Sequence, residues 1–199
     1  MDVAHAGLAH RLPGLFQTLR LEQFMNVVEV QPLTLSDGSV IPARFIRPSD
    51  AEALQRFHRR LSESSIYSRH FGFVPELSDA QAHYFTHVDG VDRCAVVALD
   101  PERPHEIVAV VRYDRDPGRA SAEYAALVED RWQGRGVGIG LTRLLIQFAR
   151  ENRVKLLYAL ILPGNVRMIR LLNSLGLPTT TRFVDGADRV EVMLKEPDV

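Results

Sequence analysis

Apolar positions change their spacing along the chain, and each spacing predicts a different element. Between residues 137 and 148 the apolar residues lie three or four positions apart, on one face of a helix: Val137, Leu141, Leu144, Leu145 and Phe148. The segments 93–99, 106–114 and 121–129 are short, apolar and rich in β-branched residues, which predicts strands. The run 155–162 is apolar almost throughout, which is typical of a strand buried on both faces.

Local signals place the ends of several elements. Ser78 followed by Gln81 forms a capping box, so we expect a helix to begin there. Gly176 is placed to end a helix that covers residues 165–175. The Asp185–Gly186 pair predicts a hairpin turn between two final strands. The remaining expected elements are helices over 51–61 and 63–71 and an extended segment around 43–46.

The elements follow one another as strand, helices, three strands, helix, strand, helix and two strands. A strand–helix–strand unit implies a parallel pair, and hairpins imply antiparallel neighbours. We therefore expect an α/β (α+β) fold with a mixed, mostly antiparallel sheet of about seven strands and helices on both faces. Residues 1–32 are expected to form a helical extension, and residues 33–199 one domain.

Composition excludes several classes of protein. Of the 199 residues, 46% are hydrophobic and 25% are charged, as in an ordinary globular protein. The formal net charge of -1 provides no overall field that would attract nucleic acid or an anionic membrane. The single cysteine, Cys94, rules out an internal disulfide framework. Signal-peptide and membrane-span patterns are not found, so we expect a cytoplasmic protein.

A cluster of four glycines lies between the strand predicted over 121–129 and the helix predicted from 136. It does not match the dinucleotide fingerprint G-x-G-x-x-G or the nucleotide P-loop, because the required Gly and Lys positions hold other residues. It does match the pattern Q-x-x-G-x-G, through Gln133, Gly136 and Gly138. No glycine is needed here merely to turn the chain, so we interpret the cluster as an anion site rather than a plain turn.

A helix that begins at this point has a clear chemical use. The first turn of a helix carries unpaired N–H groups and a partial positive charge. Because glycines leave no Cβ in the way, a pyrophosphate can accept several of these N–H groups at once. Arg135 adds a mobile cation at the same rim.

The segment that contains this motif resembles a known family. Residues 121–177, from "SAEYAALVEDRWQGRGVGIG" to "NVRMIRLLNSLGL", are similar to the acyl-CoA-binding core of the GNAT superfamily of N-acyltransferases. The preceding segments "IPARFIRPSDAEALQRFHRRL" and "LSDAQAHYFTHVDGVDRCAVVAL" resemble the subgroup of bacterial protein-lysine acetyltransferase domains. The resemblance implies a GNAT fold, in which the parallel strand pair splays apart to admit a thioester.

The resemblance also implies which residues hold the co-substrate, acetyl-CoA. The pyrophosphate is expected on the loop and first helical turn: Gln133, Gly134, Arg135, Gly136, Val137, Gly138 and Gly140. The backbone of Leu127 and Val128 is expected to bind the pantetheine arm as an added strand would. Asn165 matches the family asparagine that contacts this arm, and it could equally cap the helix that follows.

Glu123 is the candidate general base. A lysine ammonium has a pKa near 10.4 and must lose a proton before it can attack a thioester. A carboxylate on a central strand can accept that proton, directly or through water. Glu123 lies ten residues before Gln133, where the superfamily often places such a glutamate. The alternative is an exposed or salt-bridged strand residue.

The chain departs from the family at one catalytic position. Many members carry a tyrosine on the last helix that protonates the leaving thiolate, and Leu172 occupies that position here. Release of the thiolate then depends on solvent, on another residue or on the acidity of the thiol, whose pKa is about 8.5.

Several other polar residues are more ordinary candidates. His83 and His87 are four apart on a predicted helix but lack a third ligand, so no metal site is expected. His87 and Asp89 either line the acceptor pocket or bond locally. Arg56, Arg59 and Arg60 form either a solvated helix face or a contact to an acidic substrate or the CoA 3′-phosphate. Strand-end residues expected at a solvated rim are Tyr113, Asp114, Glu129 and Asp130.

The function expected from the sequence is transfer of an acetyl group from acetyl-CoA to a primary amine, either a protein lysine or a small amine. The alternative is a non-catalytic acyl-CoA sensor or regulatory module, which the missing tyrosine favours. No nucleic acid or membrane partner is expected. The extension and the last strands offer surfaces through which two chains could pair as a homodimer.

Overall fold

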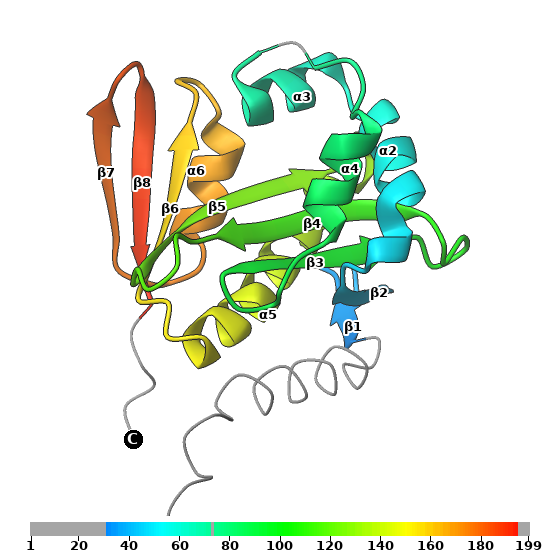
Figure 1. Cartoon of the computed structure of the whole chain (residues 1–199), viewed down its shortest axis with the longest axis horizontal. Helices are drawn as coiled ribbons and strands as arrows, with labels where there is room; N and C mark the ends of the chain where they lie inside the picture. The colour runs from blue at the N-terminus through cyan, green and yellow to red at the C-terminus, as the bar shows by residue number, and fades with distance from the viewer. Residues whose placement is uncertain (1–30, 73, 195–199) are drawn as a thin grey trace, which may run out of the picture.

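The predicted strands form one sheet in the computed structural model, which describes residues 31–72 and 74–194 (Figure 1). The spatial order of the eight strands is β1-β2-β3-β4-β5-β6-β8-β7, and only β5 and β6 pair in parallel. The strands are β1 (Gln31–Thr34), β2 (Val40–Phe45), β3 (Arg93–Leu99), β4 (Ile107–Asp114), β5 (Ser121–Val128), β6 (Leu156–Ile161), β7 (Thr179–Val184) and β8 (Ala187–Met193). The predicted mixed, mostly antiparallel fold is confirmed.

Strand β1 is the element that the sequence pattern missed. It is four residues long and pairs with β2, and the pairing places Pro32 opposite Pro42. A proline in a segment of four residues argues against a strand, although an edge strand such as β1 tolerates it. The sheet therefore begins at Gln31, two residues before the expected domain boundary, and the predicted helical extension lies almost wholly outside the described residues.

Helices cover both faces of the sheet (Figure 1). The helices are α2 (Ala51–Arg59), α3 (Glu63–His70), α4 (Asp79–Thr86), α5 (Val137–Glu151) and α6 (Val166–Asn173). Apolar residues of α5 and α6 pack in one core on one face, and those of α2, α3 and α4 pack in a second core on the other. None of the helices described within residues 31–194 is long and apolar enough to cross a membrane.

Most local signals act as the sequence predicts. Ser78 and Gln81 form the capping box of α4. Gly176 has a φ of 72° after α6, and the hairpin turn between β7 and β8 places Asp185 and Gly186 at φ 50° and 84°. The prediction that β6 is buried on both faces is wrong, because its side chains are buried only where they face α5 and α6, and Leu160 on the other face is 43% exposed.

The parallel pair β5–β6 separates, as expected. The paired residues are Ser121 with Leu156, Ala122 with Leu157 and Glu123 with Tyr158. Beyond Glu123 and Tyr158 the two strands no longer pair. We call this diverging part the fork, formed by residues 124–128 of β5 and 159–161 of β6.

Candidate active site

The fork exposes backbone groups of β5 on the side that β6 has left. The Glu129 N–H donates to the Val108 carbonyl at 2.9 Å, and Leu127 is opposite Val110 in the same ladder. Hydrogen-bonding direction alternates along an antiparallel strand, so Leu127 points its N–H and C=O toward β4. The groups that face the fork belong to Ala126 and Val128. The predicted role of Val128 therefore fits the geometry, the backbone of Leu127 is already used, and Ala126 is a residue that the sequence did not reveal.

The glycine segment connects β5 to α5 through two residues with left-handed backbone conformation. After the 3-10 turn η2 (Asp130–Trp132), Gly134 has a φ of 75° and Gly136 a φ of 92°. Residues with a Cβ rarely adopt these values. The interpretation that no glycine is needed to turn the chain is therefore wrong at these two positions. The turn and the exposed helix end come from the same residues.

The first turn of α5 supplies the N–H donors. Gly136 is the residue before the helix, and the N–H groups of Val137, Gly138 and Ile139 have no acceptor within it. The Gly140 N–H already donates to the Gly136 carbonyl at 3.0 Å. Gly140 is therefore placed as a packing residue, whereas the donors that an anion would meet lie at 137–139.

Gly138 is required for packing as well. A Cβ at this position would lie 2.9 Å from Leu171 Cδ1 and 3.5 Å from Val128 Cγ2. The end of β5, the start of α5 and helix α6 therefore meet at a point where an added Cβ would require the Leu171 side chain to shift.

Gln133 ties the loop to three other elements. Its Nε2 donates to the Val128 carbonyl at 2.9 Å and to Ser65 Oγ of α3 at 3.3 Å. Its Oε1 accepts a hydrogen bond from Arg167 of α6. The motif glutamine thus fixes the backbone at the end of β5, and Arg167 is a nearby cation that the sequence did not single out.

Arg135 is held in place rather than mobile. It forms an ion pair with Asp37 of the β1–β2 turn at 2.9 Å, and its guanidinium lies 4.4 Å from the centre of the Trp132 ring. Hydrogen bonds from Ser39, with a further one from Arg135, hold the pKa of Asp37 well below its usual range. Trp132 is buried and braces the loop, as predicted.

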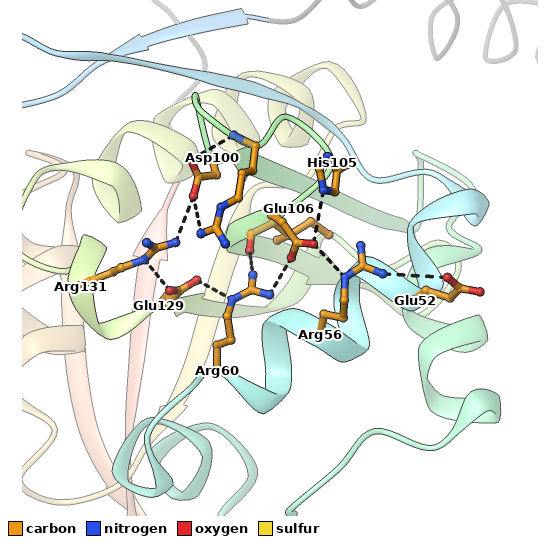
Figure 2. A network of polar contacts seen from close by, with 10 residues as sticks. Glu52, Arg56, Arg60, Asp100, His105, Glu106, Glu129 and Arg131 are labelled. Carbon is orange, nitrogen blue, oxygen red and sulfur yellow. Dashed lines mark hydrogen bonds and ion pairs between the residues drawn. The ribbon is translucent and has the colours of Figure 1, made fainter.

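A buried ion-pair network fixes the end of β5 (Figure 2). Arg60, which follows α2, reaches Glu106 at 2.7 Å and Glu129 at 3.1 Å, and Arg56 reaches Glu106 at 2.9 Å. Burial alone would raise the pKa of Glu106, but the two guanidinium groups outweigh it and lower that pKa. The prediction of a solvated Glu129 is wrong, because it is 5% exposed. Arg56 and Arg60 are likewise occupied by these acids rather than free for a phosphate.

Asp130 joins the loop to α3. It accepts hydrogen bonds from the Ser62 N–H at 2.9 Å, from Ser62 Oγ at 2.8 Å and from Ser65 Oγ at 3.2 Å. Burial would raise its pKa, but these hydrogen bonds prevail and lower it. Ser62 is also the N-cap of α3. Asp130 therefore links the start of α3 to the segment that leads into the glycine loop.

Glu123 lies at the closed end of the fork, on the face covered by α2, α3 and α4. Its neighbours Ala122 and Tyr124 are buried in the core beneath α5, so Glu123 points the other way. It is partly buried and is opposite Tyr158 and Asp114 in the two neighbouring strands. The alternative of a salt-bridged strand residue does not hold within the described part of the chain, where no cation lies at ion-pair distance from Glu123.

Two residues of α6 complete the comparison with the sequence. Asn165 Oδ1 accepts from the Met168 N–H at 3.2 Å, so the capping alternative describes what this side chain does in the structure. Leu172 is 2% exposed and belongs to the core, so it offers the fork neither a hydroxyl nor an exposed surface.

The remaining candidates bond locally. The rings of His83 and His87 stack at 3.6 Å, and Asp89 accepts three backbone N–H groups of its own loop. Tyr113 is fully buried rather than at a rim, and Cys94 is a buried small side chain, as predicted. Within residues 31–194, residue 73 aside, no group of three metal-binding side chains is found.

A pocket of about 40 Å³ opens over β5 on the Glu123 face. Its floor is formed by residues 125–127 of β5 with Val110 and Arg112 of β4. Its walls come from α2, α3, α4 and the segment before α4: Leu54, Phe57, His58, Arg69, Leu77 and Phe85. This pocket adjoins the fork from the face opposite α5. His87 and Asp89, which the sequence suggested for an acceptor pocket, do not line it.

Free amides at a helix N-terminus, a separated parallel pair and a carboxylate at its closed end are the features that the resemblance to the GNAT superfamily led us to expect. The model of the family described as "Acetyltransferase (GNAT) domain" matches residues 43–178. The chain therefore belongs to the GNAT acetyltransferases, which transfer an acetyl group from acetyl-CoA to an amine.

Two curated relatives agree with this assignment. Acetyltransferase PA5475 of Pseudomonas aeruginosa is 31% identical over 144 residues, which cover 72% of this chain and 77% of that protein. Acetyltransferase Pat of Mycolicibacterium smegmatis is 31% identical over 176 residues, which cover 83% of this chain. The match spans only 50% of the length of Pat.

Solved structures support the fold. The GNAT domain of S. lividans PAT superposes with a TM-score of 0.76 at 35% identity, covering 82% of this chain and 96% of that one. A putative acetyltransferase from Salmonella typhimurium, yncA, solved with its cofactor acetyl-CoA, has a TM-score of 0.60 at 22% identity, with coverage of 80% and 96%. The second likeness concerns the fold alone.

Proposed function

We propose that this protein transfers an acetyl group from acetyl-CoA to a primary amine, by direct attack of the amine within a ternary complex. The observation that carries the proposal is the separation of β5 and β6 beside the N-terminus of α5. One end of this arrangement suits a diphosphate, because free N–H groups and a helix dipole favour an anion. The other end suits a thioester, because Ala126 and the N–H of Val128 face the side that β6 has left, whereas the Val128 carbonyl already accepts from Gln133.

We assign each step of binding and acetyl transfer to residues of the chain. The amides at 137–139 would hold the diphosphate, and the backbone of Ala126 and Val128 would hold the pantetheine arm. A fork-facing N–H would polarise the thioester carbonyl. Glu123 would take a proton from the ammonium, through a water where direct contact is too long. The C–N bond then forms, the C–S bond breaks, and the thiolate leaves and takes up a proton.

Two measurements test this function. Calorimetry should detect binding of CoA and acetyl-CoA with competition between them, and thiol release should appear when an amine is added. Glu123→Gln should lower turnover about 100-fold, as expected for loss of a general base, with CoA affinity within about twofold. Unchanged turnover in this variant would remove Glu123 from the mechanism.

A second candidate, a non-catalytic acyl-CoA sensor, is favoured by one observation. Many family members have a tyrosine that protonates the thiolate at the position of Leu172. Here this residue is an apolar side chain buried in the core. A sensor would bind CoA with the same affinity but release no thiol with any amine, including lysine peptides. Detection of thiol release above the rate of spontaneous hydrolysis rules it out.

A further inference from the structure

The pocket over β5, which we call the acceptor face, contains a guanidinium whose charge no acid of the described residues neutralises. Arg69 of α3 lines the pocket over β5, and among the described residues no acid forms an ion pair with it. Its neighbour Arg112 is different, because Asp114 accepts two hydrogen bonds from it at 2.9 and 3.3 Å. Within the described residues, Arg112 therefore has a carboxylate partner and Arg69 has none.

Arg69 lies where an unpaired charge is costly. Burial, followed by the positive charge of Arg112, lowers the pKa of Arg69, while Glu123 and Asp114 act in the opposite direction. The walls around it are largely apolar, with Phe57, Leu77 and Phe85 among them. A guanidinium in such surroundings loses part of its hydration, and an anionic partner would compensate for that loss. An arriving carboxylate would supply that partner in bidentate geometry.

Arg69 and Glu123 form a matched pair of opposite charges. Glu123 lies on the same face of β5 as the pocket, two residues before Ala125 of its floor, and among the described residues it forms no ion pair with Arg69. Space is therefore left between a cation and an anion above the fork. A small molecule that carries both an ammonium and a carboxylate complements this arrangement. A lysine side chain brings an ammonium alone and leaves Arg69 unpaired.

The size of the pocket limits how much of an acceptor molecule can lie inside it. Its volume of about 40 Å³ corresponds to roughly three water molecules, since one water needs about 10–15 Å³ of such space. This is room for a carboxylate and a short side chain. The pocket is open to solvent, so the rest of a longer acceptor would have to lie outside it.

We propose that the acceptor is a small α-amino acid whose carboxylate binds Arg69 while its amine faces Glu123. This inference rests on the proposed acetyl transfer and names its substrate class. Arg69 is then a specificity-determining residue.

The test uses the full chain, acetyl-CoA and thiol release with matched pairs of acceptors. Each pair differs only in the carboxylate: glycine and 2-aminoethanol, L-alanine and L-alaninol, L-serine and L-serinol. A lysine peptide blocked at both ends completes the panel. Wild-type kcat/KM should favour at least one amino acid over its amino alcohol about 10- to 100-fold, the range of a charge-assisted hydrogen bond.

Variants assign the effect to Arg69. Arg69→Gln should reduce the ratio between amino acid and amino alcohol to near one, and Arg69→Lys should retain part of it. Arg59→Gln is the matched control, because Arg59 is exposed and faces away from the pocket, and its ratio should equal that of the wild type. Circular dichroism and CoA affinity verify that each variant is folded.

Three results would overturn the inference. One is a higher kcat/KM for the blocked lysine peptide than for every amino acid. Another is an unchanged ratio in Arg69→Gln. The third is an Arg69→Gln variant whose kcat/KM falls more with succinyl-CoA than with acetyl-CoA. That result would assign Arg69 to a carboxylate on the acyl chain. Failure of the proposed function looks different, because CoA then binds and no amine in the panel releases thiol.

Discussion

The glycine loop and the acceptor face both adjoin strand β5, but they are built in different ways. The loop and the first turn of α5 form one contiguous segment, residues 133–139, whose free donors are the backbone N–H groups of residues 137–139. The acceptor face combines side chains from α2, α3, α4, β4 and β5, which lie far apart in the sequence. Backbone donors depend on conformation, so a short motif can specify them. Side-chain pockets depend on tertiary packing, and no local pattern specifies them.

The largest expected effect follows from a change in loop conformation. Gly136→Val places a β-branched residue at a φ of 92° and a Cβ 3.3 Å from the Ser36 backbone nitrogen. Left-handed backbone costs about 1–2 kcal/mol for such a residue, and with methyl groups beside the anion site we expect roughly 100-fold weaker CoA binding. Calorimetry measures the change.

A matched glycine provides the control. Gly140→Ala lies inside α5, where the nearest atom to a new Cβ is Leu33 Cδ1 at 3.6 Å. Alanine in a helix interior is favoured over glycine by about 0.8–1 kcal/mol, so this variant should melt at a slightly higher temperature with CoA affinity unchanged. A large loss of CoA affinity in Gly140→Ala would show that the donor site extends further than residues 137–139.

The next effect concerns the network that supports both regions. Arg60→Met removes the cation that Glu106 and Glu129 share, while Glu106 keeps Arg56 and Glu129 keeps Arg131 as partners. Loss of the charge-assisted hydrogen bonds alone should cost about 1.5–3 kcal/mol. Urea denaturation should show this loss of unfolding free energy. Arg59→Met is the control, because Arg59 is exposed, and its stability should change by less than about 0.5 kcal/mol. Equal stabilities for the two variants would contradict the assigned role of Arg60.

A smaller effect is expected at the motif glutamine. Gln133→Ala removes the hydrogen bonds to Val128 and Arg167, each contributing about 1 kcal/mol, so CoA affinity should fall about 5- to 10-fold. Turnover at saturating CoA should change less, because Glu123 is untouched. The exposed Gln147 of α5 gives the matched control Gln147→Ala, which should bind CoA as the wild type does. A loss confined to turnover would argue against an anchoring role.

The smallest effect is a pH dependence on the acceptor side. Burial, with the charges of Arg69 and His58, lowers the pKa of His70 from 6.5 to about 4. The folded state therefore favours neutral His70, so its contribution to stability is complete above pH 6.5 and is lost as the pH falls from 6.5 toward 4. Melting temperatures measured across this window should fall less steeply in His70→Gln. Parallel curves would contradict the assignment.

The same contrast explains what the sequence could predict. The helical spacing of Val137 to Phe148 and the pattern Q-x-x-G-x-G located α5 and the loop, because both depend on neighbours in the chain. Strand β1 was missed because two prolines masked a pairing that only the edge of the sheet tolerates. Leu127 was chosen in place of Ala126 because the direction of each backbone group depends on the register with β4.

The acceptor face was out of reach for a related reason. Arg56, Arg60 and Arg69 look alike in the sequence. Only packing shows that two of them meet buried carboxylates and the third meets none. The same holds for Glu129 and Glu123, of which one is locked in ion pairs and the other points to the pocket side.

The contact around Gly138 has a consequence for how the site meets its ligand. Val128, Leu171 and the start of α5 pack so closely that an extra carbon atom at Gly138 would displace the Leu171 side chain. The spacing between the last residues of β5 and helix α6 is therefore set when the chain folds. A binding site that already has its working dimensions loses little conformational entropy on association, so more of the contact energy remains available as affinity.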